Sequence, residues 1–393
     1  MTTLAAPLAP APPAPAPAGT PIEPGEDRPL RILMVAARYL PDMGGIETHV
    51  REVGRRLAAA GHAVTVLTAD RTRARPPVEA ADGMLIRRVP AWPRGRDYYW
   101  APGIWREVMR ADCDLLHVQG CHTLVPPLAM LAALRRRLPF VITFHSGGHS
   151  SSLRNRLRGL QWALLGGLVR RATRRIAVSR FEADLFSARM RFPRDAVSVV
   201  SNGAQLPAAK APAAADPERP LIVSIGRLER YKGHHRAIEA MPDILAQRPG
   251  ARLRVLGEGP YQQALTELAD RLGIADRVEI GGVPPAERER LAALLGSAAL
   301  VVLLSEYEAH PVAVLEALAL GLPVLVTDST GFMEMAEEGM VATVRPAAGS
   351  TEIAQAVLAA LTDNRAGRAA PLPDWQDCAD RLLAVYRSAT KGR

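Results

Sequence analysis

A chain of 393 residues is too long for one ordinary hydrophobic core, so two domains of about 150–200 residues each are expected. Hydrophobic residues make up 48% of the chain, as in globular proteins, and the net charge of +9 favours anionic ligands or surfaces. Nucleic acid is nevertheless not an expected partner, because only 5% of the residues are aromatic and no zinc-finger spacing or RNA-binding aromatic motif occurs.

Cysteine usage indicates the redox environment. Cys113, Cys121 and Cys378 form neither a disulfide framework nor a C-x-x-C metal pair, so we expect a reducing, cytoplasmic location. The first residues lack the basic and apolar regions of a signal peptide, and no apolar run is long enough to span a membrane.

The chain begins with a segment that cannot build a core. Residues 1–28 are mostly Ala, Pro, Gly and Thr, and we expect them to be a disordered tail. Arg31–Ala37 then has the apolar pattern of a buried parallel strand, and Ile46–Ala60 has helical periodicity. Gly44 and Gly45 lie between them, where backbone N–H groups can approach an anion at a helix N-terminus. A tight turn alone would also require glycine there.

Strands and helices continue to alternate up to about residue 205. A helix is predicted over Leu124–Arg137, followed by a strand over Phe140–Phe144 that brings His145 to the carboxyl edge of the sheet. His145 and His149 are separated by two glycines rather than by a helix, and no third ligand is apparent. We therefore expect no metal site here.

A basic helix is predicted over Leu153–Arg175. The segment contains seven arginines and no acidic residue, and its leucines recur at helical spacing. Such a helix can lie on an anionic membrane surface, or it can pack on the core with a solvated basic face. Both interpretations stay open at this point.

A linker rich in Pro and Ala, residues 206–219, precedes a second α/β series. Its first strand, Leu221–Ile225, leads into a loop in which Arg227 and Lys232 are flanked by glycines, and a helix over His234–Gln247 follows. A guanidinium and an ammonium group at a helix N-terminus form an arrangement that suits a diphosphate.

A pair of carboxylates marks a later strand-to-helix connection. Glu308 follows an apolar strand, Pro311 fits the first turn of a helix, and Glu316 lies within that helix. Ligands bind at this edge of open α/β sheets. Alone, the pair favours the simpler interpretation of a solvated helix start. Together with Arg227 and Lys232 it suits a nucleotide sugar, which carries both hydroxyl groups and a diphosphate.

Several motifs in the chain resemble those of the family 4 retaining glycosyltransferases of GT-B fold. The match covers about residues 30 to 365 and is more specific in the C-terminal half. It rests on these segments: Gly44-Gly45-Ile46-Glu47, Asn202-Gly203, Gly226-Arg227-Leu228, Lys232-Gly233, Gly257-Glu258-Gly259-Pro260, the E-x7-E motif Glu308 to Glu316, Gly321-x-Pro323-Val324 and Gly331-x-x-Glu334.

The resemblance implies an α/β GT-B fold, with two doubly wound Rossmann-like domains facing across a deep cleft. Residues 29–205 would form the acceptor-side domain and residues 220–370 the domain that binds the nucleotide sugar. Residues 371–393 would form a C-terminal helix that packs back towards the first domain.

The resemblance also implies the roles of individual residues. Arg227 and Lys232 would bind the donor diphosphate, Glu308 the transferred sugar and Glu316 the ribose, while His145 would lie near the sugar and the acceptor. The implied catalytic residues are His145, Arg227, Lys232 and Glu308. The implied donor-binding residues are Gly44, Gly45, Gly226, Arg227, Lys232, Glu308, Ala309, His310, Pro311, Val312 and Glu316.

One segment departs from the family pattern. Many members have Gly-Phe-Gly after the first glutamate, with backbone N–H groups that contact the donor, whereas this chain has Ala309-His310-Pro311. Pro311 has no N–H group to donate. The identity of the donor sugar is therefore open, and His310 is a candidate replacement donor.

The implied reaction is transfer of a hexosyl group from a UDP-sugar, or from GDP-mannose, to a hydroxyl group of a saccharide, glycolipid or natural product. No cofactor or tightly bound metal is expected. Peripheral membrane contact through Leu153–Arg175 and a location at the inner membrane face remain possible. The alternatives are a nucleotide-sugar epimerase of the same fold, a non-catalytic homologue, and a dinucleotide-dependent oxidoreductase, whose glycine fingerprint is incomplete at Gln262.

Overall fold

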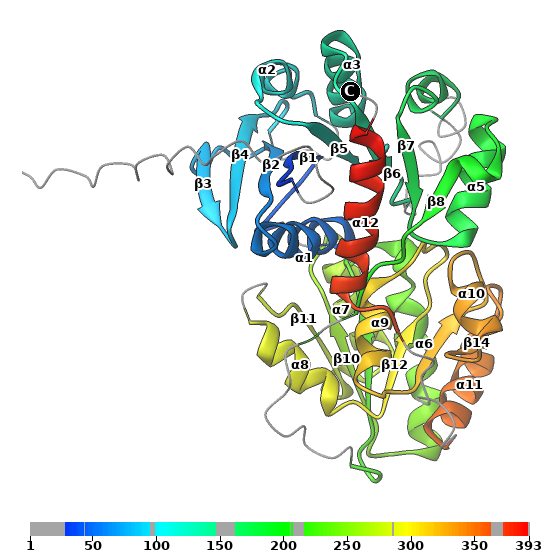
Figure 1. Ribbon diagram of the computed structural model, residues 1–393. Helices are drawn as coiled ribbons and strands as arrows, with labels where there is room; N and C mark the ends of the chain where they lie inside the picture. Colours follow the sequence, from blue (N-terminus) through cyan, green and yellow to red (C-terminus); the bar gives the residue numbers. More distant parts are fainter. Residues whose placement is uncertain are drawn as a thin grey trace, which may run out of the picture.

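The computed structural model describes residues 28–42, 44–94, 99–146, 162–204, 206, 216–284, 287–362 and 372–391. The expected tail up to residue 27 and most of the expected linker lie outside these ranges. Two sheets, each with helices packed around it, form the molecule (Figure 1).

The first sheet has eight strands in the order β3-β4-β2-β1-β5-β6-β7-β8. Neighbouring strands run parallel except β3 and β4, which are antiparallel. The strands are β1 (Arg31–Ala36), β2 (Ala63–Asp70), β3 (Val78–Ala81), β4 (Met84–Pro90), β5 (Leu115–Gln119), β6 (Phe140–Thr143), β7 (Arg174–Ala177) and β8 (Val197–Val199).

The second sheet has six strands, all parallel to their neighbours, in the order β11-β10-β9-β12-β13-β14. The strands are β9 (Leu221–Ile225), β10 (Arg252–Leu256), β11 (Val278–Gly281), β12 (Leu300–Leu303), β13 (Val324–Thr327) and β14 (Ala342–Val344). The predicted fold class, with two doubly wound α/β domains, is confirmed.

The named helices connect these strands and cover the sheets. In the first part of the chain they are α1 (Gly45–Ala59), α2 (Gly103–Arg110), α3 (Val125–Arg136) and α5 (Arg180–Met190). In the second part they are α6 (His234–Gln247), α7 (Gln262–Arg271), α8 (Arg288–Gly296), α9 (Val312–Ala319), α10 (Phe332–Glu337), α11 (Ser350–Thr362) and α12 (Trp375–Thr390).

The central strands are apolar because both of their faces are buried. Along β1, Leu33 and Val35 pack into one core cluster, whereas Ile32 and Met34 pack into the cluster on the opposite face. The period-2 alternation of a strand sends successive side chains to opposite faces, so a strand between two helical layers has no polar face.

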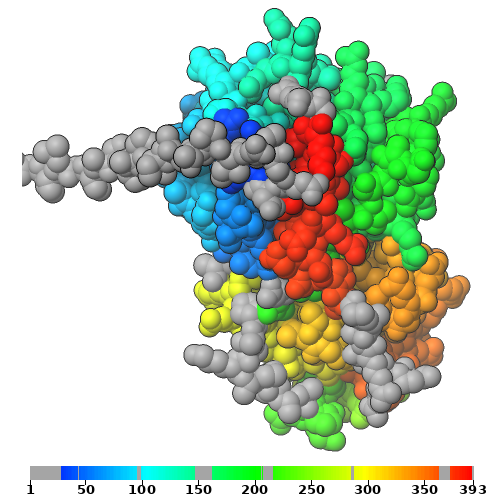
Figure 2. All heavy atoms as spheres, in the orientation of Figure 1, coloured from blue at the N-terminus to red at the C-terminus, as the bar shows by residue number. Residues whose placement is uncertain are grey.

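The last helix, α12, packs on the first domain. Trp375, Leu382 and Tyr386 share a buried cluster with Val50 and Leu57 of α1. The helix crosses the front of the first domain and reaches the boundary between the two halves (Figures 1 and 2).

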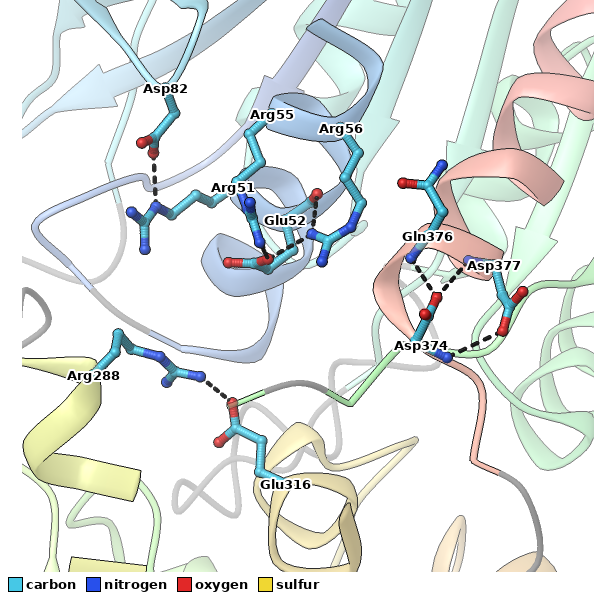
Figure 3. Close-up of polar contacts among 10 residues, drawn as sticks. All are labelled: Arg51, Glu52, Arg55, Arg56, Asp82, Arg288, Glu316, Asp374, Gln376 and Asp377. Atoms are coloured by element: carbon cyan, nitrogen blue, oxygen red, sulfur yellow. Dashed lines mark hydrogen bonds and ion pairs between the residues drawn. The ribbon is translucent and has the colours of Figure 1, made fainter. Parts of the chain in front are cut away.

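A capping box starts α12. Asp374 accepts hydrogen bonds from the backbone N–H groups of Gln376 and Asp377, and the Asp377 side chain accepts one from the Asp374 backbone (Figure 3). These bonds satisfy N–H groups that have no partner within the helix. They fix the point at which the chain turns back towards the first domain.

One sequence expectation for the first domain was wrong, and three elements were not predicted. The basic helix does not continue to Arg175: residues 162–169 are helical, Arg174 and Arg175 belong to β7, and residues 153–161 lie outside the described ranges. The β3–β4 hairpin and α2 were not predicted; none of these elements is longer than eight residues. Among the helices that the structure describes, none is both long and apolar enough to cross a membrane.

Candidate active site

The carboxyl ends of the two sheets meet at the domain boundary. The Tyr307 hydroxyl, after β12, donates to Ser146 Oγ, after β6, at 2.8 Å. Asn202 Nδ2, after β8, donates to the His310 carbonyl oxygen at 3.0 Å. Loops from both sheets therefore face each other, as ligand sites in open α/β sheets require.

Lys232 and Glu308 form an ion pair at this boundary. Lys232 Nζ lies 2.5 Å from Glu308 Oε1, and Ser305 Oγ donates to the same oxygen at 2.9 Å. Their side chains are only 17% and 11% exposed. Burial lowers the pKa of Lys232, but Glu308 and Tyr231 together outweigh burial and the net shift is upward, so the ammonium stays charged. The predicted phosphate cation and the predicted sugar carboxylate thus lie side by side.

Arg227 has acidic neighbours from both domains. Its guanidinium lies 2.9 Å from Glu229 Oε1. Across the boundary, burial raises the pKa of Glu47 on α1, and the charges of Arg38 and Arg227 oppose that rise. The first turn of α1 and the loop after β9 are thus electrostatically coupled, although Glu47 and Arg227 belong to different domains.

Glycines allow close backbone approach in the loop that carries Arg227. A Cβ atom on Gly257 would lie 1.9 Å from the Gly226 carbonyl oxygen, and one on Gly233 would lie 2.0 Å from the Leu304 carbonyl oxygen. Gly233, with φ of 74°, also caps the N-terminus of α6, where a side chain would be strained. These glycines bring the loops after β9, β10 and β12 together.

Glu316 on α9 pairs with Arg288, the first residue of α8 (Figure 3). The Glu316 side chain is 4% exposed. Burial raises its pKa; Arg288 opposes the rise, and Glu52 of α1 adds to it. Figure 3 places Arg51, Glu52, Arg55 and Arg56 of α1 on the opposite side of the boundary from this pair.

Backbone hydrogen bonds of Glu308 hold the start of the unusual Ala309-His310-Pro311 segment. The Glu308 N–H donates to Thr330 Oγ1 at 2.9 Å, and Gly331 N–H donates to the Glu308 carbonyl oxygen at 2.9 Å. His310 Nδ1 is buried without a hydrogen-bond partner, and burial lowers the pKa of the ring to about 4. The ring is therefore neutral at pH 7. Pro311 precedes α9 as its N-cap residue rather than lying inside the helix.

His145 lies two residues after the end of β6 and has a left-handed backbone conformation, φ 47°, which is uncommon for a residue other than glycine. Its Nε2 lies 2.7 Å from Gln119 Oε1, and its carbonyl oxygen lies 2.7 Å from His122 Nε2. The next N–H group, of Ser146, donates to the buried Glu182 carboxylate. The loop after β6 is thus fixed from three directions.

Gly44 is the N-cap residue of α1, and Gly45 is the first residue of that helix. Glu47 folds over this end: a Cβ atom on Gly44 would lie 2.7 Å from Glu47 Oε2. The glycine pair therefore lies at the N-terminus of α1, as predicted, and the Glu47 carboxylate lies beside the predicted anion site.

Sequence reasoning missed several residues that shape the site, namely Gln119, Glu182, Arg288 and Tyr307. Glu182 in the first turn of α5 and Arg288 at the start of α8 are single charged residues, and such residues carry no spacing signal. No group of three or more potential metal ligands occurs among the residues that the structure describes.

Comparisons with known proteins identify the family of the chain. The model described as "Glycosyltransferase Family 4" matches residues 43–206, and the model described as "Glycosyl transferases group 1" matches residues 207–371. A D-inositol 3-phosphate glycosyltransferase from Nocardiopsis dassonvillei is 30% identical, over 90% of this chain and 91% of that protein. The chain therefore belongs to glycosyltransferase family 4, and it is a glycosyltransferase of GT-B fold.

Solved structures share the fold. Sucrose-phosphate synthase from Thermosynechococcus elongatus has a TM-score of 0.72 at 20% identity, over 91% of this chain and 98% of that one. HepE from Anabaena, in complex with UDP and glucose, has a TM-score of 0.70 at 18% identity, over 91% of this chain and 99% of that one. At these identities the likeness concerns the fold.

Proposed function

We propose that this glycosyltransferase transfers a hexosyl group, with retention of anomeric configuration, from a UDP-sugar to a hydroxyl group of a second molecule. The observation that carries this proposal is the Lys232–Glu308 pair at the start of α6, with Arg227 nearby. It sets cations that suit a diphosphate beside a carboxylate that suits sugar hydroxyls.

Each group has a proposed part in the reaction. Arg227 and Lys232 stabilise negative charge on the departing nucleotide diphosphate. Glu308 accepts hydrogen bonds from the transferred sugar, and Glu316 accepts them from the ribose. The backbone N–H groups at Gly44 and Gly45 approach the phosphates from the opposite domain. The departing phosphate helps to remove the acceptor proton, because no side chain is placed as a nucleophile in this scheme.

UDP is the proposed nucleotide because HepE, which shares the fold, was solved with UDP and glucose. GDP-mannose stays a second donor to test. An inositol phosphate is a reasonable first acceptor, because a relative at 30% identity carries the name D-inositol 3-phosphate glycosyltransferase. Saccharides, glycolipids and natural products are further classes. Contact of the segment around residues 153–175 with the inner membrane face stays a prediction.

A donor panel tests the proposal. UDP-glucose, UDP-N-acetylglucosamine, UDP-galactose and GDP-mannose are incubated with the full chain, and release of nucleotide diphosphate is measured with and without acceptor. Lys232→Gln should reduce release about 100-fold, because a cation opposite the developing charge is lost. Lys391→Gln, at the end of α12, is the matched control and should not change it.

Two outcomes would contradict the proposal. If none of the four donors binds or releases nucleotide, the donor assignment is wrong. If the anomeric proton coupling of the product shows inversion, the retaining mechanism is wrong even though transfer occurs.

A further inference from the structure

A buried chain of polar side chains connects α12 to His145. The Tyr386 hydroxyl lies 2.6 Å from His117 Nδ1, and His117 Nε2 lies 2.8 Å from Thr143 Oγ1. Gln119 joins the two histidines, with Nε2 at 3.1 Å from His117 Nδ1 and Oε1 at 2.7 Å from His145 Nε2. All five side chains are at most 7% exposed.

This arrangement fixes where the hydrogen of the His145 ring resides. A carboxamide oxygen only accepts hydrogen bonds, so His145 Nε2 must donate to Gln119 Oε1 and must carry the hydrogen. The carboxamide nitrogen of Gln119 only donates, and it lies 3.1 Å from His117 Nδ1 and 3.4 Å from His117 Nε2, so it faces the His117 ring without fixing the tautomer of that ring.

The remaining nitrogen of His145 has the opposite character. Burial and the nearby rings of His49 and His117 hold the pKa of His145 well below its usual value, so the ring is neutral. A neutral imidazole that carries its hydrogen on Nε2 can only accept a hydrogen bond at Nδ1.

We propose that Gln119 is a positioning residue for glycosyl transfer, which holds His145 as the Nε2–H tautomer and leaves Nδ1 as an acceptor for a substrate hydroxyl group. This inference rests on the proposed function for the substrate, but the tautomer is a property of the protein alone. A hydroxyl of the sugar or of the acceptor, rather than a phosphate or a carbonyl group, is the ligand chemistry that Nδ1 would recognise, because Nδ1 has no hydrogen to give.

The first experiment does not depend on activity. The full chain is labelled with 15N-histidine, and long-range 1H–15N correlation spectra identify the tautomer of each ring. The His145→Gln variant assigns the His145 signals by their loss. We expect Nε2–H in the parent protein and a mixture of tautomers in Gln119→Leu. Gln263→Leu, on the exposed helix α7, is the matched control and should leave the spectrum of His145 unchanged.

The second experiment uses turnover. Gln119→Glu keeps the shape of the side chain but places a carboxylate against His145, which raises the pKa of that histidine. Its kcat should fall as the pH drops through the raised value, in a range where the kcat of the parent protein stays flat. Gln119→Leu should lower kcat about tenfold with little change in donor KM.

An Nδ1–H tautomer in the parent protein, or an unchanged tautomer in folded Gln119→Leu, would overturn the proposal. So would a pH profile of Gln119→Glu that superimposes on that of the parent protein. If Gln119→Leu does not fold, the isosteric glutamate variant supplies the test. Absence of turnover with every donor would refute the proposed function, and the NMR result would still decide the tautomer.

Discussion

At the scale of single residues, the two glutamates of the E-x7-E motif have different surroundings. Near the domain boundary, Glu308 forms an ion pair with Lys232 and accepts a hydrogen bond from the Ser305 hydroxyl group. Glu316 is more deeply buried and has Arg288 as its ion-pair partner. The E-x7-E spacing does not distinguish the two glutamates, because the ion-pair partner of each comes from a distant part of the chain.

Removal of Arg288 should therefore damage both stability and donor binding. In Arg288→Gln the buried Glu316 carboxylate loses its cation, and we expect the free energy of unfolding to fall by about 2–3 kcal/mol. This is less than for a fully buried pair, because the Arg288 side chain is 19% exposed. Urea unfolding measures the loss, and donor KM should rise.

Arg290→Gln is the matched control for that variant. Its 2.9 Å pair with Glu287 has side chains that are 63% and 43% exposed, so its loss should change stability by less than about 0.5 kcal/mol. Equal effects of the two substitutions would show that Arg288 does not support Glu316.

At the scale of elements, the loop between β12 and α9 depends on close packing against the start of α10. A Cβ atom on Gly331 would lie 1.9 Å from the Ala309 carbonyl oxygen. The segment that carries Glu308 is thus placed by a neighbouring helix, through a contact that leaves no room for a side chain.

Gly331→Ala should displace this loop. Because backbone atoms must move, we expect a loss of about 1–3 kcal/mol in stability and at least a tenfold loss of donor turnover. Thermal unfolding and the nucleotide-release assay measure the two effects. A Cβ atom on Gly349 meets nothing within 4 Å, so Gly349→Ala should be neutral or slightly stabilising. Full activity in Gly331→Ala would show that the position of the Glu308 loop does not depend on close packing at Gly331.

At the scale of the whole molecule, contacts hold the two domains together near the site. Glu334 of α10 accepts a hydrogen bond from the Phe181 N–H at the start of α5. Arg180 lies 3.6 Å from Glu334 and 3.6 Å from Glu338, but its side chain is 56% exposed. The bond at the helix start should therefore matter more than the exposed ion pairs.

Glu334→Ala should weaken the association of the two domains by about 1.5–3 kcal/mol, because the Phe181 N–H group loses its charged acceptor. Small-angle X-ray scattering should then show a larger radius of gyration than for the parent protein. Glu338→Ala removes only an exposed pair and should leave the scattering curve unchanged. A curve for Glu334→Ala that matches the parent would mean that other contacts fix the domains.

Buried neutral histidines should make the molecule sensitive to acid. Burial lowers the pKa of His49, His234 and His310 to about 4, below the usual 6.5 of an unfolded chain. Between these values the unfolded chain binds more protons, so stability falls as the pH drops from 6.5 towards 4. Each group contributes up to about 1.4 kcal/mol per pH unit. Burial raises the pKa of Glu47, Glu182 and Glu316, which acts in the opposite direction.

The His310→Leu variant isolates one of these contributions. Urea unfolding at pH 6.5, 5.5 and 4.5 should give a smaller loss of stability with falling pH than in the parent protein. An identical pH dependence would show that His310 is protonated equally in both states.

Periodicity was sufficient to predict much of the fold. The helix over His234–Gln247 was predicted with the bounds that it has, because strong apolar spacing follows a glycine that can cap it. The extension of the basic helix to Arg175 was wrong, because a strand with polar side chains at its start has no distinctive pattern. The hairpin at β3 and β4 was not predicted either; its strands are only four and seven residues long.

The sequence by itself determined the two-domain α/β architecture, the family, and the presence of Arg227, Lys232, Glu308 and Glu316, because these depend on local periodicity and on motif spacing. The tertiary structure alone decided their partners: Lys232 with Glu308, Arg288 with Glu316, and Gln119 with His145. These pairs join residues that are 76, 28 and 26 positions apart in the chain. No local pattern encodes such contacts, since they arise only when the sheets bring their carboxyl edges and loops together.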